Sequence, residues 1–229
     1  QLIKTIPHYG LLMPDSTYEV STTVTVPIVM MGTAWFYVYT DYYDQVYEHV
    51  GRYNNVTRSD SVNIRLTPPA DLAPQNITAD HTVSTGATFN FSYEIHNQGA
   101  GEPNNSQWLD RCYLSTSAFA LENAILMAED WHYSSLEHGD YYAISHTVTL
   151  PSNISGGTYY LFVQTDVQNN VFEYDMEDNN LLCMGQPIVV VMPDLQIRIL
   201  NSEDTLHAAA EEGISYYVAN MDEGAIVNR

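Results

Sequence analysis

The chain has 229 residues and a formal net charge of −21, with 28 acidic residues against seven lysines and arginines. Nucleic acids and anionic lipid surfaces are bound through clusters of Lys and Arg, so this charge excludes nucleic-acid binding and membrane contact of that kind. The apolar stretch at 24–39 is too short to cross a bilayer and is interrupted by Pro27 and Gly32. A chain of this length buries a normal core without metals or disulfides.

The first residue is Gln1, and no signal peptide follows it, so we expect a processed piece or a window cut from a longer protein. Localisation must be inferred from other signs. Five N-x-S/T sequons favour an extracellular, cell-surface glycoprotein: Asn55, Asn76, Asn90, Asn104 and Asn153.

The sequence repeats itself with a period of about 124 residues. "GTAWFYVYTD" (32–41) matches "GTYYLFVQTD" (157–166), and "PADL" (69–72) recurs as "MPDL" (192–195). A long repeat period indicates repeated structural units, independently of the secondary-structure propensities of single residues. It predicts three segments: the C-terminal part of one repeat (1–68), a complete repeat (69–192), and the N-terminal strands of a further repeat (193–229).

Within the first segment, one turn is apolar where its counterpart in the complete repeat is the polar loop "SNISG" (152–156). Water disfavours four apolar side chains at a loop tip, so we expect contact with a neighbouring domain or subunit. Packing within its own half-domain is the alternative. The residues are Ile28, Val29, Met30 and Met31.

The complete repeat shows period-two alternation over short runs that end at Gly, Pro or Asn, which is typical of half-buried antiparallel strands. The nearest helical pattern, at 115–130, would supply at most one short turn. Short strands without βαβ alternation predict an all-β fold, a two-sheet immunoglobulin-like β-sandwich repeated in tandem. We predict seven strands, near 72–78, 87–96, 108–115, 123–129, 141–150, 158–166 and 184–191.

The complete repeat resembles a CARDB domain, the cell-adhesion-related domain of bacterial and archaeal surfaces. The resemblance is carried by the opening "DL", by "N-x-G" after the second strand, by "YLS" in the third, and by "LP…G-x-YYL…D…V-x-E…NN" near the end. It implies an immunoglobulin-like sandwich used in tandem on cell surfaces, with a structural or adhesive role and no catalytic residues. The third segment departs from the pattern, with "NMDEG" where the second has "NQGAG".

An acid-rich block, "VQTDVQNNVFEYDMEDNN" (163–180), recurs without a gap as "VYTDYYDQVYEHVGRYNN" (38–55). Asp and Asn side chains in such a hairpin bond loop amides that lack a ladder partner, which favours an architectural role. Calcium is the alternative, although the D-x-D-x-D-G spacing is absent. Its ligands would be Asp166, Glu173 and Asp175.

Cys112 and Cys183 both lie in the complete repeat. An extracellular compartment permits a disulfide between them, yet the sixth predicted strand separates them within a sheet. A disulfide and two free thiols therefore both stay open. The first segment has Arg58 where Cys183 aligns, so such a bond is no general requirement of the fold.

No zinc motif, nucleophile elbow or catalytic triad can be assembled, and we expect a chain that is not an enzyme and binds no cofactor other than calcium. The prediction is a non-enzymatic extracellular structural or adhesive module of a long microbial surface protein or filament. Its expected partners are neighbouring copies, adjacent repeats and surface glycans, without nucleic acid or membrane insertion. The alternative is a carbohydrate-binding accessory module of a surface hydrolase, with Trp108 and Trp131 stacking on sugar.

The two partial segments raise one further alternative, in which residues 193–229 of one molecule complete residues 1–68 of the next. Strand donation of this kind builds surface fibres. The joined halves would lack the equivalent of residues 107–124. We therefore favour a window of a longer repeat chain.

Overall fold

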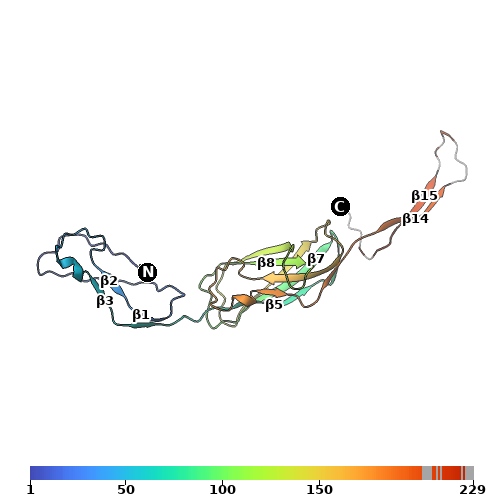
Figure 1. Ribbon diagram of the computed structural model, residues 1–229. Coiled ribbons are helices and arrows are strands. Elements are labelled where there is room, and N and C mark those ends of the chain that lie inside the picture. Colours follow the sequence, from blue (N-terminus) through green and yellow to red (C-terminus); the bar gives the residue numbers. More distant parts are fainter. Residues whose placement is uncertain (203–207, 210, 212, 223, 225–229) are drawn as a thin grey trace. The chain divides into compact units, whose positions relative to one another are not determined.

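The computed structural model describes residues 1–202, 208, 209, 211, 213–222 and 224. The chain divides into two compact units, Gln1–Thr67 and Pro68–Arg229, and each is described by itself (Figure 1). Regular structure in the described residues consists of strands and two 3₁₀ turns, η1 (Gly51–Asn54) and η2 (Glu177–Asn179). No helix in this part of the chain has the length and apolar character needed to span a bilayer.

The second unit contains a two-sheet sandwich. One sheet has three strands in the order β10-β7-β5, and the other has the order β6-β13-β11-β8-β9 with β12 also paired to β11. These pairs are antiparallel except β13 with β6. The strands are β5 (Leu72–Ala79), β6 (Thr82–Ser84), β7 (Thr88–Asn97), β8 (Trp108–Ser115), β9 (Ile125–His132), β10 (Tyr141–Thr149), β11 (Gly157–Gln164), β12 (Leu181–Cys183) and β13 (Ile188–Val191).

The core lies between the two sheets because the sequence alternates along the strands. In β7 the inward residues Phe89, Phe91, Tyr93 and Ile95 are buried, whereas the residues between them are exposed or half-buried. Side chains two positions apart share one face of a strand, so this spacing directs four large side chains into one core. That core receives further buried residues from the opposite sheet, including Leu114, Leu161 and Ile188.

The predicted fold class is confirmed, because the structure is all-β with an immunoglobulin-like sandwich. The seven predicted strands correspond to β5, β7, β8, β9, β10, β11 and β13, and the short strands β6 and β12 were not predicted. The segment 115–130, expected to supply at most one short helical turn, has none and instead leads into β9. The apolar residues there alternate across an extended strand that pairs with β8.

The first unit repeats part of this pairing with only short strands. They are β1 (Gly32–Ala34), β2 (Tyr37–Tyr39), β3 (Val56–Arg58) and β4 (Val62–Ile64), joined by long irregular connections (Figure 1). Tyr37 pairs with Arg58, as Phe162 pairs with Cys183 in the sandwich. Strand β1 likewise pairs with β4 as β11 pairs with β13, although the sandwich has one residue more between β12 and β13 than the first unit has between β3 and β4.

Other segments of the first unit that match strands of the sandwich stay irregular. Residues 16–25, which align with β10, form no strand, and β10 itself pairs only with β7. The first unit contains no counterpart of β7, so the 16–25 segment has no strand to pair with. Among residues 1–67, all of which the structure describes, none is buried.

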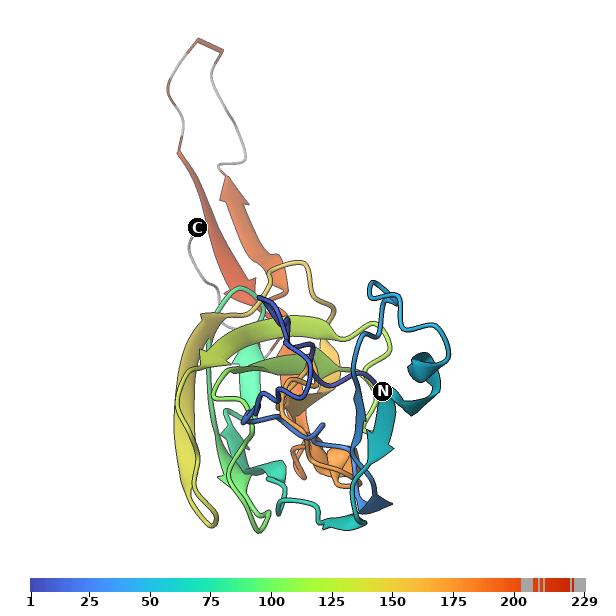
Figure 2. The ribbon, with the colours of Figure 1, turned by 90° about the vertical axis from the view of Figure 1, so that its left-hand side faces the viewer.

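The hairpin of β14 (Leu195–Ser202) and β15 (Ile214–Asn220) reproduces the start of the sandwich (Figure 2, red strands). Leu195 pairs with Asn220, as Leu72 pairs with Asn97, and both strand pairs contain a register shift a few residues later. The same backbone pattern therefore occurs twice. The division into segments 1–68, 69–192 and 193–229 stays a prediction, and part of its last segment lies outside the described residues.

Replacing Leu161 by Ala tests the core. Leu161 is fully buried in β11, so its truncation leaves a cavity and is expected to lower the free energy of unfolding by about 2–5 kcal/mol. Leu126→Ala is the matched control, because that side chain is 50% exposed and its loss should cost about 0.5 kcal/mol or less. Urea denaturation followed by tryptophan fluorescence measures both, and equal losses would contradict the assigned core.

Candidate functional site

The acid-rich block forms a loop between β11 and β12, and Asp166 organises its first turn. One carboxylate oxygen of Asp166 accepts the backbone N–H of Asn170 at 2.9 Å, and the other accepts that of Val171 at 2.8 Å. Asp166 has a φ of 43°, a left-handed conformation that Asp tolerates better than most residues. The side chain thus satisfies two loop amides that no strand reaches.

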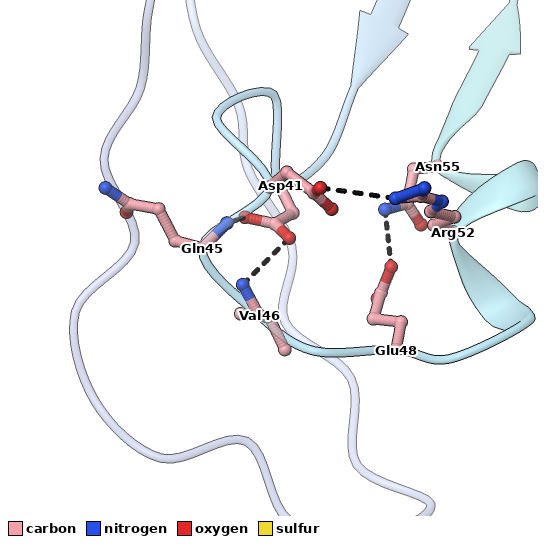
Figure 3. A network of polar contacts seen from close by, with 7 residues as sticks. Asp41, Gln45, Val46, Glu48, Arg52 and Asn55 are labelled. Carbon is pink, nitrogen blue, oxygen red and sulfur yellow. Dashed lines mark hydrogen bonds and ion pairs between the residues drawn. The ribbon is translucent and has the colours of Figure 1, made fainter.

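The equivalent loop of the first unit has the same geometry. Asp41, also with a φ of 43°, accepts the backbone N–H groups of Gln45 at 2.8 Å and Val46 at 3.0 Å (Figure 3). Glu48 accepts a hydrogen bond from Asn55 Nδ2 at 2.5 Å, as Glu173 does from Asn180 Nδ2 at 2.7 Å. The repeated sequence therefore specifies a repeated hydrogen-bond pattern.

Glu173 joins this loop to the first strand of the sandwich. Its carboxylate is fully buried, and Oε1 accepts the backbone N–H of Leu72 at 2.6 Å. Leu72 lies in β5, at the edge of its sheet, so its amide depends on this bond once it is buried. Burial raises the pKa of Glu173 to about 7, against the opposing effect of the hydrogen bonds from Leu72 and Asn180.

The three residues proposed as calcium ligands are used differently. Asp166 and Glu173 direct their carboxylates at backbone amides and at Asn180, whereas Asp175 is exposed. Within the described part of the chain, no group of three or more His, Cys, Asp or Glu side chains is arranged to hold a metal ion. Calcium binding by Asp166, Glu173 and Asp175 stays a prediction, and it would require breaking hydrogen bonds of the loop.

A second buried carboxylate, Asp110 in β8, was not singled out from the sequence. It accepts hydrogen bonds from Tyr142 Oη at 2.5 Å and Thr165 Oγ1 at 2.7 Å, and Trp108 Nε1 donates to Tyr142 Oη at 2.9 Å. Burial raises the pKa of Asp110 to about 6. One signal was present, because Asp110 alternates with the apolar residues Trp108 and Cys112 on one face of a strand.

Asn97, from the "N-x-G" motif, ties the start and the middle of the sandwich together. Its Oδ1 accepts the N–H groups of Asp71 and Gly99, and its Nδ2 donates to the carbonyls of Gly101 and Leu136. Asn220 repeats this role in the β14–β15 hairpin. It accepts from the backbone of Asp194 at 2.9 Å and donates to the Gly224 carbonyl.

Of the two alternatives left open for Cys112 and Cys183, the structure contains two free thiols and no disulfide between them. Strand β11 lies between them, with Val163 opposite Cys112 and Phe162 opposite Cys183. Two strand spacings of about 4.8 Å exceed the Cα separation that a disulfide allows, about 7 Å, and successive residues point to opposite faces. The register therefore favours the free-thiol alternative. Burial raises the pKa of both thiols.

The apolar turn lies at the surface of the first unit. Ile28, Val29 and Met31 are exposed and Met30 is half-buried, in a turn closed by the Met30 N–H and the Pro27 carbonyl. These side chains are thus available for contact with another domain or subunit. The partner itself stays a prediction.

The five sequon asparagines differ in accessibility. Asn55 is half-buried, and the other four are exposed. The side chains of Asn76, Asn90 and Asn104 hydrogen-bond to Glu94, Asp80 and the Phe172 backbone, respectively. Among the described residues, no hydrogen bond involves the side chain of the remaining sequon asparagine, Asn153.

The two tryptophans proposed to stack on sugar do not form one exposed platform. Trp108 is fully buried, and its ring stacks on His132 with centroids 4.1 Å apart. Trp131 is 44% exposed and lies beside Tyr133. The carbohydrate-binding alternative therefore loses Trp108.

The buried carboxylates predict an unusual pH dependence. A raised pKa in the folded state means that the stabilising, protonated form is lost as pH rises, between about 4.5 and 7 for Glu173 and between about 3.8 and 6 for Asp110. The sandwich should therefore be more stable at pH 5 than at pH 8, with Glu173 contributing about 1–3 kcal/mol.

Thermal unfolding across this pH window, with Glu173→Gln, measures the contribution of Glu173. The neutral variant should flatten the pH dependence, because Gln keeps an acceptor for the Leu72 amide and does not titrate. Glu122→Gln, an exposed position outside the loop, is the control. A wild-type profile that rises steadily from pH 5 to pH 8 would contradict the assignment.

Comparison with known proteins places this fold in a family. The family model CARDB matches residues 69–183. No curated protein matches the chain. The crystal structure of a CARDB domain from Pyrococcus furiosus, in complex with di-metal ions, is 20% identical, with 54% of this chain and 90% of that chain covered and a TM-score of 0.41. The solution structure of a domain of a putative cell surface protein from Methanosarcina acetivorans is 20% identical. The match covers 53% of this chain and 92% of that chain, with a TM-score of 0.39.

The family match spans 115 of the 229 residues, from 69 to 183, which is half of the chain. It covers the sandwich from β5 to β12, including the loop that carries Asp166 and Glu173, and ends before β13. The chain belongs to the CARDB family, whose cell-adhesion-related domains are non-catalytic modules of the cell-surface type.

Proposed function

We propose that the chain is a non-enzymatic extracellular module with a structural and adhesive role, forming part of a long microbial surface protein or filament. The observation that carries this proposal is the recurrence of strand registers: β2–β3 repeats β11–β12, and β14–β15 repeats β5–β7. Tandem copies of one sandwich provide length and stiffness rather than a catalytic pocket.

The polar groups of the sandwich support the same role. The buried carboxylates of Asp110, Asp166 and Glu173 are each occupied by hydrogen bonds from the protein's own backbone and side chains. A carboxylate held in this way fixes loops and strand ends. Its oxygen atoms already accept hydrogen bonds from the protein, so they are not placed to exchange a proton with a substrate.

The joints between the predicted segments are consistent with this role. Residues 67–72 read "TPPADL" and residues 191–195 read "VMPDL", so each joint is short and contains proline. Proline fixes one backbone angle and limits swivelling. A net charge of −21 adds repulsion that keeps such surfaces apart and soluble.

Immunogold electron microscopy of the cells that make the protein tests the surface role. An antibody against the 69–192 sandwich should label the exterior of intact cells, and the label should follow extended structures if the module belongs to a filament. An antibody against an internal protein is the control for leakage. Label that requires permeabilised cells would contradict the proposal.

Sequon occupancy provides a second prediction. If the protein is glycosylated outside the cell, Asn153 should carry glycan, because it is exposed and makes no side-chain hydrogen bond among the described residues. Asn55 should stay unmodified, because it is half-buried and its amide nitrogen donates to Glu48 at 2.5 Å. Mass spectrometry of peptides from the native protein measures both sites, and glycan at Asn55 but not at Asn153 would contradict this ranking.

A further inference from the structure

The two joints lie against the strands that follow them. In the first joint (67–72), the Asp71 N–H donates to Asn97 Oδ1 at 3.1 Å, and the Asp71 carbonyl accepts the Gln98 N–H at 2.7 Å. Asn97 ends β7, the strand that pairs with β5. Residues 97–101, with the sequence "NQGAG", form the loop that follows, and we call it the glycine loop. This loop holds the end of the joint through its backbone and its asparagine.

The two prolines of the first joint present carbonyl groups and no N–H groups. Proline lacks a backbone donor, so Pro68 and Pro69 each contribute only an acceptor. The glycine loop supplies a donor, because the Gly101 N–H donates to the Pro69 carbonyl at 3.0 Å. Asn97 Nδ2 donates to the Gly101 carbonyl at 2.8 Å and so fixes the far end of the loop. The loop is thus matched to a joint that contains prolines.

The close approach of joint and loop leaves no room for a side chain at Gly99 or Gly101. A Cβ on Gly99 would lie 2.6 Å from the Pro69 carbonyl oxygen, and a Cβ on Gly101 would overlap the Pro68 carbonyl oxygen. Non-bonded heavy atoms prefer a separation of about 3.5–4.0 Å. Neither glycine has a left-handed backbone. Space for the joint, rather than backbone conformation, therefore requires glycine at these two positions.

The second joint, which precedes β14, repeats this contact. The Asp194 N–H donates to Asn220 Oδ1 at 2.9 Å, and Asn220 Nδ2 donates to the Gly224 carbonyl. A Cβ on Gly224 would overlap the backbone of Met192 and Pro193. The two loops, "NQGAG" and "NMDEG", share the asparagine and the last glycine, and both of these residues contact the joint in each copy.

The second joint also contacts the sandwich that precedes it. The Gly156 N–H, in the turn before β11, donates to Met192 Sδ at 3.1 Å. The Val191 carbonyl accepts the Thr85 N–H at 3.1 Å. Met192 therefore contacts both Gly156 of the sandwich and Gly224 of the following strand pair, and all of these residues belong to one compact unit.

We propose that the glycine loop is a seat for the joint that precedes its own domain, with Gly99 and Gly101 as the residues that admit the joint. The seated joint moves as one body with the strands that follow it and is no flexible linker. At the second joint, Met192 extends this body to the preceding sandwich. The inference rests on the structural role proposed above and deepens it, because a tandem array gains stiffness only where its joints are held.

Amide hydrogen exchange of Gly101 tests the seat in the wild-type chain. Gly101 lies outside the strands, and its N–H donates to the Pro69 carbonyl. A seated joint should slow its exchange about 100-fold or more relative to an unprotected loop amide. Exchange at the unprotected rate would overturn the proposal. The immunogold result is independent of this measurement, so a failure of the seat and a failure of the surface role are distinguishable.

A substitution at Gly99 tests whether space for the joint is the cause. Gly99→Ala should displace the joint and speed the exchange of the Gly101 amide about tenfold or more, while amides in the middle of β7 stay protected. Gly185→Ala is the matched control, because no atom lies within 4 Å of a Cβ there and its backbone is not left-handed. A Gly99→Ala chain that exchanges like the Gly185→Ala chain would overturn the proposal.

Nuclear magnetic relaxation of the Ala70 amide nitrogen gives a second readout, which in the wild-type chain does not depend on any variant folding. Ala70 should have an order parameter of about 0.85, the value of a rigid backbone, whereas a flexible linker gives less than about 0.6. Gly101→Ala should lower the Ala70 value, and Gly185→Ala should leave it unchanged. A wild-type value below about 0.6 would contradict a seated joint.

Residual dipolar couplings test the second joint. Because Met192 contacts both the sandwich and the β14–β15 hairpin, the amides of β11 and β15 should fit one alignment tensor in the wild-type chain. Gly224→Ala should require two tensors, since its Cβ would displace Met192, whereas Gly213→Ala, with no atom within 4 Å of a Cβ, should keep one. A wild-type chain that requires two tensors, or a Gly224→Ala chain that keeps one, would overturn the role of Met192.

Discussion

The buried hydrogen bond from the Leu72 amide to Glu173 is the constraint on which the sandwich depends. It joins the first strand to the loop before the last strands, across 101 residues of sequence. Leu72 is fully buried, so its amide would lose water without gaining a partner if Glu173 were absent. The acidic loop is built around this bond, with Asp166 holding the turn that brings Glu173 inward. The carboxylates of this loop therefore stabilise the fold.

The first unit forms some of the strand pairs of the sandwich and not others. The pairings of β2 with β3 and of β1 with β4 are kept, because both partners of each pair are present. Residues 16–25 stay irregular, because the strand that their counterpart β10 pairs with has no equivalent there. Local turns such as that of Asp41 form without the rest, since their hydrogen bonds reach only five residues ahead. Long-range burial requires the whole sandwich.

Much of the fold could be predicted from the sequence, because period-two alternation and the internal repeat report directly on strands and their order. The architectural role of Asp166 also followed from the Asx chemistry of its loop. The Leu72 partner of Glu173 could not be predicted, since nothing in the sequence links residues so far apart. The buried position of Trp108 and the hydrogen-bond partners of Asp110 were likewise hidden, because alternation identifies a strand but does not reveal that a central strand is covered on both faces. The choice between a disulfide and two free thiols at Cys112 and Cys183 stayed open in the sequence, because it depends on the register of the strands on both sides of β11.

Amide hydrogen exchange of the Leu72 N–H tests the central claim most directly, namely that a buried carboxylate closes the sandwich. Leu72 opens an edge strand, where amides that face away from the sheet ordinarily exchange rapidly with solvent. The account predicts that its amide is protected as strongly as the amides in the middle of β7, and that this protection falls selectively when Glu173 is replaced by Ala. Rapid exchange of the Leu72 amide in the wild-type protein would contradict the claim.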